Sequence, residues 1–434
     1  MRPSYAVPGR RPLGADALVV VAVLAAAFLV AAPVRPATSH KLLELVAAVS
    51  LCLAAPVWAA LLAALALAAD WGSLIHVSPA TSAAISVLVV VCVLVRSALA
   101  GRSRISAGGA AAAAAVIGGG LFVAAVDGNN LASLGVWRAA LPYLLLALLA
   151  LRFDAATYSR LFDAFSAFAV LYCVLFLLQE TTSHHWLPGV TSTQQADLGG
   201  SVITRVQAYG QLVPTIAFLW AVASLLAKVG SRRRAFLVGA LSIATVVAGL
   251  GRTALIALLL AGVVTAILAA AKQPNARGAA VKLLGVCAVT FGIAFLYLSE
   301  RISSSYHELT SGTGNWGVRL AEWHDRMPII SSHLLLGVGW DAQPDLGTSD
   351  SSLASALVRF GFLGLAAGLV AVIVACRRAS RIAGEPDATA SRDGLFVFGG
   401  LLYLTLAAVT TSSLYYPFGI AVFALLVGRA WTTR

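Results

Sequence analysis

The sequence predicts an all-α polytopic membrane protein with about 12–14 transmembrane helices and a large extracytoplasmic loop before the last three helices. Apolar residues make up 60% of the chain and charged residues 11%, whereas a soluble domain is about half apolar and a quarter charged. Apolar runs of about 17 to 25 residues recur from end to end, and each is long enough to cross a hydrocarbon core of roughly 30 Å. We therefore expect residues 1–434 to form a single membrane domain.

The expected spans follow the apolar runs in chain order. Residues 41–70 form either one long span or two short ones, and Pro56 favours two, because proline breaks the helical hydrogen-bond ladder. The first run follows a basic N-terminus, as in a signal peptide, but it is long enough to be a retained helix. The spans are expected at residues 17–34, 42–55, 57–70, 82–98, 107–126, 136–151, 161–179, 208–228, 235–251, 253–270, 283–299, 352–376, 394–412 and 416–430.

Basic residues predict the orientation, because cytoplasmic loops are enriched in Lys and Arg. With the N-terminus and the C-terminus both cytoplasmic, 21 of the 30 basic residues lie inside and the other 9 (30 − 21) lie outside. The inner loops are short, whereas two outer segments are long, at residues 180–206 and 300–351. We expect recognition or chemistry at this outer, extracytoplasmic face.

The cysteines and the net charge argue against two classes of partner. All five cysteines fall in apolar runs without metal-ligand spacing, so we interpret them as small core residues. The net charge of +12 comes from basic residues that are spread over the loops. A nucleic-acid partner would require them on one soluble face, so we expect none.

Two arginines stand at the outer ends of expected helices. Arg252 lies between two short apolar runs, at the tip of a predicted hairpin, and Arg205 lies just before an apolar helix. Ionisable residues near membrane depth cost about 2.5 to 3.5 kcal/mol on insertion scales and are functional candidates by default. The alternative for both is a membrane-edge arginine that reaches lipid phosphates.

The outer segment 316–330 has the spacing of a short amphipathic helix. Its apolar stripe would lie on the membrane surface or on the roof of the protein, although Pro328 makes its last turn uncertain. Its polar residues lie three and four apart and so share one face, on which Glu322 pairs with either arginine. This face is either a candidate site or a solvated surface. The apolar stripe comprises Leu320, Trp323, Met327 and Ile330, and the polar face comprises Arg319, Glu322 and Arg326.

Four outward residues are candidates for a general base. Asp350 ranks first, because it directly precedes a long apolar helix and would be fixed at the helix entrance. An Asp followed by serines at a helix start also suits an N-cap, which is the structural alternative. Glu322, His324 and His333 are the other candidates.

Several arginines on one face predict a site for a multiply charged anion. Guanidinium groups bind phosphate through two parallel hydrogen bonds and stay charged, so a diphosphate is a natural ligand. Where the diphosphate is a leaving group, as in glycosyl transfer, arginines also stabilise the charge that develops on it, and this role requires no metal and no cofactor.

Five short motifs follow one another along the chain: Arg205-Val-Gln-Ala-Tyr-Gly210 with Pro214, Gly251-Arg-Thr-Ala-Leu255, Arg319-Leu-Ala-Glu-Trp323, Gly337-Val-Gly339, and Asp350-Ser-Ser-Leu353 leading into Phe360-Gly-Phe-Leu-Gly364. Taken together and in this order, they resemble the O-antigen polymerase and ligase superfamily of bacterial envelope proteins. They cover about the second half of the chain, and the first half matches in hydropathy alone.

The resemblance implies a multi-pass protein of the bacterial plasma membrane that transfers a saccharide from an undecaprenyl-diphosphate-linked donor to a glycan or lipid-glycan acceptor. It implies that Arg205, Arg252 and Arg319 contact the diphosphate. Family ligases often have His-Asn where this chain has Asp350-Ser351. We therefore favour a polymerase-like or exopolysaccharide-forming role, with a ligase as the nearest alternative.

Three rival functions remain open. A transporter or flippase of lipid-linked oligosaccharides usually has ionisable groups near the bilayer midplane, whereas these spans are almost free of charge. A metal-dependent glycosyltransferase of the other multi-helix type has an acidic pair in its first outer loop, and residues 35–41 contain no acid. A non-catalytic envelope scaffold is the third.

Overall fold

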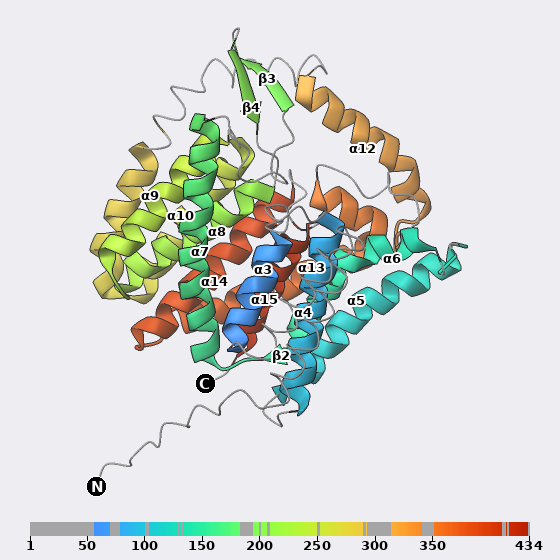
Figure 1. The fold of residues 1–434 in the computed structure, drawn as a ribbon, viewed down its shortest axis with the longest axis horizontal. Helices are drawn as coiled ribbons and strands as arrows, with labels where there is room; N and C mark the ends of the chain where they lie inside the picture. Colours follow the sequence, from blue (N-terminus) through green and yellow to red (C-terminus); the bar gives the residue numbers. More distant parts are fainter. Residues whose placement is uncertain are drawn as a thin grey trace, which may run out of the picture.

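The computed structural model describes residues 56–69, 79–99, 104–128, 130–131, 133–182, 194–198, 201–205, 209–249, 252–289, 292, 314–340, 351–409, 414 and 416–432. The predicted spans 17–34 and 42–55 lie outside these residues. Figure 1 shows helices packed around α14, with few strands.

The elements follow one another along the chain with short connections in several places. They are α3 (Val57–Ala68), α4 (Pro79–Leu99), β1 (Arg104–Ile105), α5 (Ala107–Val126), α6 (Leu134–Ala140), η2 (Leu141–Ala150), β2 (Leu151–Arg152), α7 (Ala155–Thr182), β3 (Gln194–Leu198), β4 (Ser201–Arg205), α8 (Tyr209–Ala227), α9 (Arg232–Ala248), α10 (Arg252–Lys272), η3 (Pro274–Ala276), α12 (Gly314–Ser332), α13 (Ser352–Ile382), α14 (Ala388–Ala408) and α15 (Pro417–Trp431).

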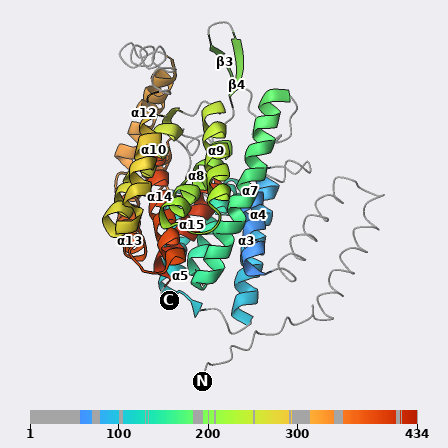
Figure 2. The ribbon, with the colours of Figure 1, turned by 90° about the vertical axis from the view of Figure 1, so that its left-hand side faces the viewer.

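Helix α14 lies at the centre of the bundle and is buried on nearly all sides. It packs against α8, α10, α13 and α15, and small residues permit the close approach: Gly399 faces Thr265 of α10, and Gly400 faces Leu426 of α15. From Gly394 onward the helix is apolar on all sides apart from Thr405, as expected of a helix in such a position. The antiparallel hairpin β3–β4 projects beyond the helices in both views (Figures 1 and 2).

Four helical stretches are long and apolar enough to cross a membrane: Ala107–Val126, Ala155–Leu178, Ala254–Lys272 and Ser352–Ile382. Shorter apolar helices accompany them, and large apolar side chains are exposed on several, including Phe122, Phe236 and Val281. Lipid covers such faces in a membrane protein. The all-α, membrane-embedded character is therefore confirmed, whereas a total of 12–14 spans stays a prediction.

Several elements differ from the sequence prediction. The span predicted at 136–151 consists of the α-helix α6 followed by the 3₁₀-helix η2, which begins at Leu141-Pro142. The segment 180–206, predicted to lie outside the membrane, contains the hairpin β3–β4, which the hydropathy pattern did not predict. Of the span predicted at 283–299, the described part is helical over 283–289 and at 292.

Helix α13 is broken near its start, at Gly361. This residue has φ +61° and ψ −166°, a conformation that only glycine adopts readily. The break leaves backbone groups on both sides without helical partners. They bond instead to the turn Leu334–Trp340, hereafter the strap: the amides of Val338 and Gly339 donate to the carbonyl groups of residues 358 and 359, and the amides of residues 362 and 363 donate to those of residues 334 and 335, at 2.8 to 3.2 Å.

The other end of the strap is held by α5. The Trp340 amide and indole N–H groups donate to the carbonyl oxygens of Gly120 and Ile117, at 3.1 and 3.0 Å. A Cβ on Gly120 would lie 2.3 Å from the indole nitrogen of Trp340, so this contact requires glycine. The strap therefore connects α5 to the broken helix.

Hydrogen bonds between helices show which helix termini lie at the same end of the bundle. Near its N-terminus α14 contacts α7 and, through Ser391, the end of α10 at Gln273. At its C-terminus, Val409 accepts a hydrogen bond from Ser351 at the start of α13. Because α10 has 21 residues, its start at Arg252 lies about 30 Å from Lys272. We call the end that contains Ser351 and the strap the strap end. The opposite end, where α14 contacts α7 and the end of α10, is the network end.

We predict that Gly361→Ala lowers stability by about 2 kcal/mol or more, because alanine is strained at this φ and its Cβ would lie 2.4 Å from the Leu335 backbone. Thermal unfolding of the purified protein in detergent measures this loss. The matched control is Gly368→Ala in the same helix, where an added Cβ meets open space. Equal melting temperatures for the two variants would contradict the proposed role of the break.

Candidate functional site at the strap end

The predicted arginines belong to α10, β4 and α12, and each of these elements has one end at the strap end of the bundle. Arg252 is the first residue of α10, and Arg205 ends β4, four residues before Tyr209, the first residue of α8. The C-terminus of α8 leads through a short turn to α9, whose Arg234 contacts α7 at the network end, so α8 begins at the opposite end. Arg319 lies near the start of α12, and the other end of this helix, at Ser332, leads into the strap.

The side chains of Arg205, Arg252, Arg319 and Glu322 lie outside the described part of the structure, as does Asp350 altogether. The neighbouring Ser351 is described: its hydroxyl caps α13 by accepting a hydrogen bond from the Ala354 amide at 3.3 Å. The capping position at the start of α13 therefore belongs to Ser351, which leaves Asp350 one residue outside the cap.

Arg326, one of the three residues of the predicted polar face, is buried. It is 8% exposed, and it lies three residues after Trp323 and four before Ile330, on the same side of α12. These two members of the predicted apolar stripe pack against Leu357 and Val358 of α13. Met327, another member of the stripe, is exposed. The packed side of α12 thus includes Trp323 and Ile330 as predicted, and Arg326 in addition.

The two histidine candidates differ in their surroundings. His324 is highly exposed and lies 4.0 Å from the equally exposed Asp325. His333 contacts Asp127 at the C-terminus of α5, with 3.1 Å from Nε2 to Oδ1, while its Nδ1 lies 2.9 Å from the Ser332 hydroxyl. His333 therefore connects the end of α12 to the end of α5. Sequence analysis missed Asp127, which has no pattern of its own to mark it.

Arg359 is a second buried arginine at this end of the bundle. Unlike Arg326, it was not among the residues that sequence analysis singled out. It is 6% exposed, its guanidinium carbon lies 5.5 Å from the Trp340 ring centroid and 6.0 Å from that of Tyr143, and Nη1 donates to the Ala139 carbonyl oxygen at 3.4 Å. A charge within an apolar helix start is itself a signal for function. The residue precedes the helix break by two positions, so the strap, η2 and α13 meet at its side chain.

Buried charges at the network end are neutralised by one another. Arg392 donates to Asp393 at 3.0 and 3.2 Å, to Asp163 at 2.5 Å and to the Ser159 hydroxyl at 2.6 Å. Arg429 of α15 donates to the second oxygen of Asp393 at 3.3 Å. These contacts join α7, α14 and α15. Such a saturated network is typical of a structural role.

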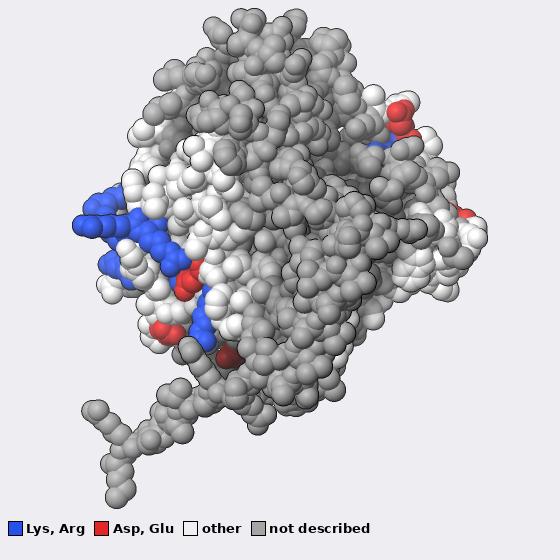
Figure 3. Space-filling model, viewed as in Figure 1, with Lys and Arg blue, Asp and Glu red and all other residues white. Residues whose placement is uncertain are grey.

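Exposed basic side chains surround the network end. They include Lys228, Arg232, Arg233, Lys272, Arg277, Arg377 and Arg381. Figure 3 shows Lys and Arg side chains along its lower left edge, with few acidic ones among them. The threading from sequence places all of these on the cytoplasmic side, and the strap end on the outer side.

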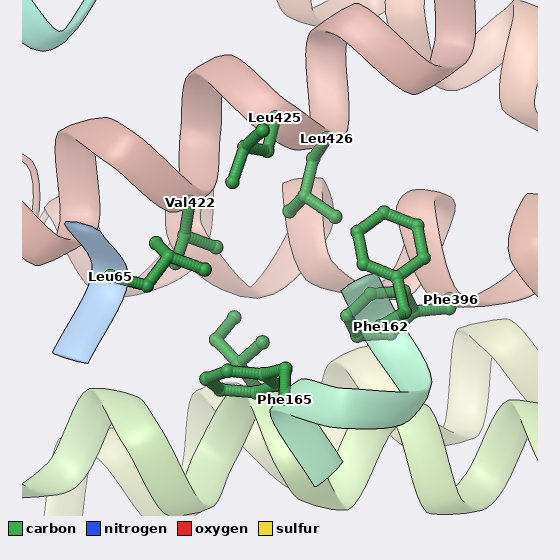
Figure 4. Close-up of a pocket in the computed structure, with 8 residues that line it drawn as sticks. Leu65, Phe162, Phe165, Phe396, Val422, Leu425 and Leu426 are labelled. Atoms are coloured by element: carbon green, nitrogen blue, oxygen red, sulfur yellow. The ribbon is translucent and has the colours of Figure 1, made fainter. Parts of the chain in front are cut away.

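A small cavity inside the bundle does not suit a polar substrate. Its volume is about 20 Å³, which is enough for roughly one water molecule. Figure 4 shows its lining of apolar side chains from α3, α7, α14 and α15, among them Leu65, Phe165 and Val422. We interpret it as a packing defect in the core.

No three His, Cys, Asp or Glu side chains among the described residues come together as a metal site would require. The long apolar helices and their exposed apolar faces define an all-α, membrane-embedded protein with a polar cluster at each end. No model of a known protein family matches the chain, and no curated protein matches it.

We predict that Asp393→Ala destabilises the protein by about 3 to 5 kcal/mol, because it leaves two buried guanidinium groups without their shared carboxylate. Thermal unfolding in detergent gives the comparison. Asp387→Ala is the control, since Asp387 is exposed and caps the same helix with one hydrogen bond to the Thr389 amide. A loss no larger than that of the control would show that the network contributes little.

Proposed function

We propose that the protein is a glycosyltransferase of the bacterial envelope, which passes a saccharide from an undecaprenyl-diphosphate-linked donor to an acceptor glycan at the extracytoplasmic face. The chain-forming, polymerase-like reaction is the favoured form, and ligation to another acceptor is the nearest alternative. No metal or cofactor takes part. The site is the strap end.

One observation carries this proposal: the elements that bear Arg205, Arg252 and Arg319 reach the same end of the bundle as Ser351, the neighbour of Asp350. These residues are far apart in the chain, and scattered termini would have removed the basis for a shared site. Arg326 and Arg359 add two buried positive charges at this end. A cationic region at the edge of apolar helices suits a lipid diphosphate.

The proposed reaction forms one bond and breaks one. An acceptor hydroxyl oxygen attacks the anomeric carbon of the donor saccharide, and the bond from this carbon to the diphosphate oxygen breaks. Asp350 takes the proton of the hydroxyl group as general base. Arg205, Arg252 and Arg319 stabilise the negative charge that the lipid diphosphate gains as it leaves.

The broken helix α13 favours one alternative, because transporters often build substrate sites at helix breaks. Elongation and transport give different products. Purified protein incubated with a lipid-diphosphate oligosaccharide yields longer glycans under our proposal. In vesicles, movement of the labelled donor across the bilayer without elongation would support a flippase instead.

We predict that Arg252→Ala and Arg319→Ala each abolish glycan transfer while the protein remains folded, because each removes a positive charge from the diphosphate site. Gel analysis of glycan length and size-exclusion chromatography measure the two properties. The matched control is Arg233→Ala, an exposed arginine at the network end, which should retain activity. Full activity in both site variants would refute the proposed site.

We predict that Asp350→Asn reduces the turnover number by about 100-fold or more, as expected for loss of a general base. Asp350→Glu should keep part of the activity, because it preserves a carboxylate. Both variants should melt close to the wild type, since Ser351 provides the cap of α13. Equal destabilisation of both would instead assign Asp350 to helix capping.

A further inference from the structure

Four basic side chains gather where the ends of α10 and α13 meet, at the network end of the bundle. Lys272 ends α10 and Arg277 follows η3, whereas Arg377 and Arg381 lie about one turn apart near the end of α13. All four side chains are exposed. We call these four residues the cationic junction. Like charges repel each other, so their meeting on two separate segments of the chain requires an explanation.

The fold holds the two segments of the cationic junction together. The Gln273 side-chain amide donates to the Ala383 carbonyl oxygen at 2.8 Å, which links the end of α10 to the end of α13. Lys272 also reaches this point, since a Cβ on Gly384 would lie 3.6 Å from its Cδ. The Gly384 amide donates to the Arg381 carbonyl oxygen at 3.1 Å. Packing and hydrogen bonds therefore bring the charges of the two segments into one patch.

The carboxylates of the network end do not neutralise this patch. Asp163 and Asp393 bind the buried arginines, and Asp387 caps α14 through the Thr389 amide. Glu385 lies in the turn after α13 and is half-buried. Within the part of the chain that the structure describes, no carboxylate forms an ion pair with a member of the cationic junction. The surface of the junction is therefore positively charged.

Exposed apolar side chains adjoin the cationic junction on the side that faces the strap end. On α13, Ile373 and Val370 precede Arg377 by four and seven residues, which places them on the same helix face, and they are 50% and 60% exposed. On α10, Ile267 lies five residues before Lys272 and is 55% exposed. Cations beside an apolar surface match the boundary between lipid headgroups and hydrocarbon. A nucleic acid would instead require them on a soluble face.

We infer that the cationic junction binds the headgroup of an anionic phospholipid of the adjoining membrane leaflet. Guanidinium groups bind phosphate oxygens through paired hydrogen bonds, and the acyl chains of the same lipid cover the apolar residues beside them. A zwitterionic lipid fits less well, because its own ammonium group offsets the phosphate charge. The inference goes beyond the proposed function and does not depend on it, since the donor is proposed to act at the other end of the bundle.

The bound headgroup stabilises the contact between α10 and α13, because it neutralises charges that repel each other there. The exposed Arg232 and Arg233 of α9 lack this arrangement. They are neighbours on one helix, and the next residue, Arg234, donates to the Asp163 carbonyl oxygen and the Ser166 hydroxyl of α7. The α9 pair therefore provides a control of equal charge at the same end of the bundle.

Native mass spectrometry tests the binding directly. The whole chain in detergent is mixed with equal amounts of dioleoyl phosphatidylglycerol and dioleoyl phosphatidylcholine, which share their acyl chains. We expect phosphatidylglycerol adducts at least about fivefold more abundant than phosphatidylcholine adducts. Arg377→Ala/Arg381→Ala should lower the phosphatidylglycerol adducts about tenfold, and Arg232→Ala/Arg233→Ala should keep them within about twofold of the wild type. Equal retention of both lipids by the wild type, or an equal loss in both double variants, would overturn the inference.

Thermal unfolding in the same detergent is the second arm. Phosphatidylglycerol should raise the melting temperature of the wild type by about 4 °C or more, because it binds the folded state, and phosphatidylcholine should not. Arg377→Ala/Arg381→Ala should lose this increase. Without lipid the same variant should melt no lower than the wild type, since two repelling charges are removed. A variant that keeps the increase, or that melts below the wild type without lipid, would contradict a lipid-binding role for these arginines.

Discussion

The arrangement of the strap end depends on the hydrogen bonds between the strap and the broken helix α13. In an apolar environment an unbonded amide or carbonyl group costs several kcal/mol, so a helix can break only where other backbone groups take over its bonds. The strap supplies two donors and two acceptors at this point. The positions of His333 and Arg359 on either side of the break follow from this exchange.

Charge is distributed differently at the two ends of the bundle. At the network end Asp393 and Asp163 neutralise Arg392 and Arg429, and the result is a connection between helices. At the strap end the arginine Arg359 lies against two aromatic rings and a carbonyl group. Aromatic faces attract a cation through their quadrupole. The contacts of Arg359 thus differ in kind from the carboxylate pairs at the network end.

Hydropathy could predict much of the fold but little of the site. The span predicted at 107–126 coincides with α5, because Ser106 caps its start and Asp127 follows its end. In α13 the periodicity continues smoothly through Gly361, and a glycine within an apolar run is compatible with an unbroken helix, so the break could not be seen. Whether Arg359 is buried depends on Trp340 and Tyr143, and no local pattern contains that information.

The sequence predicted individual positions for the site but not how they come together. Arg252 and Arg205 were selected because a charge next to an apolar run is rare and costly. On α12 two members of the predicted stripe, Trp323 and Ile330, pack against Leu357 and Val358 of α13, whereas Met327 is exposed and Arg326 is buried. Which side chains of this helix pack is decided by residues of α13, and the local pattern of α12 does not contain them.

The network end also constrains the order of assembly. Asp393 enters the bundle with α14, but the guanidinium group of Arg429 belongs to α15, which follows α14 in the chain. Until α15 packs against α14, one oxygen of this buried carboxylate lacks its bond to Arg429. A nascent chain that stalls between the two helices would therefore present an incomplete polar core to the quality-control machinery of the cell.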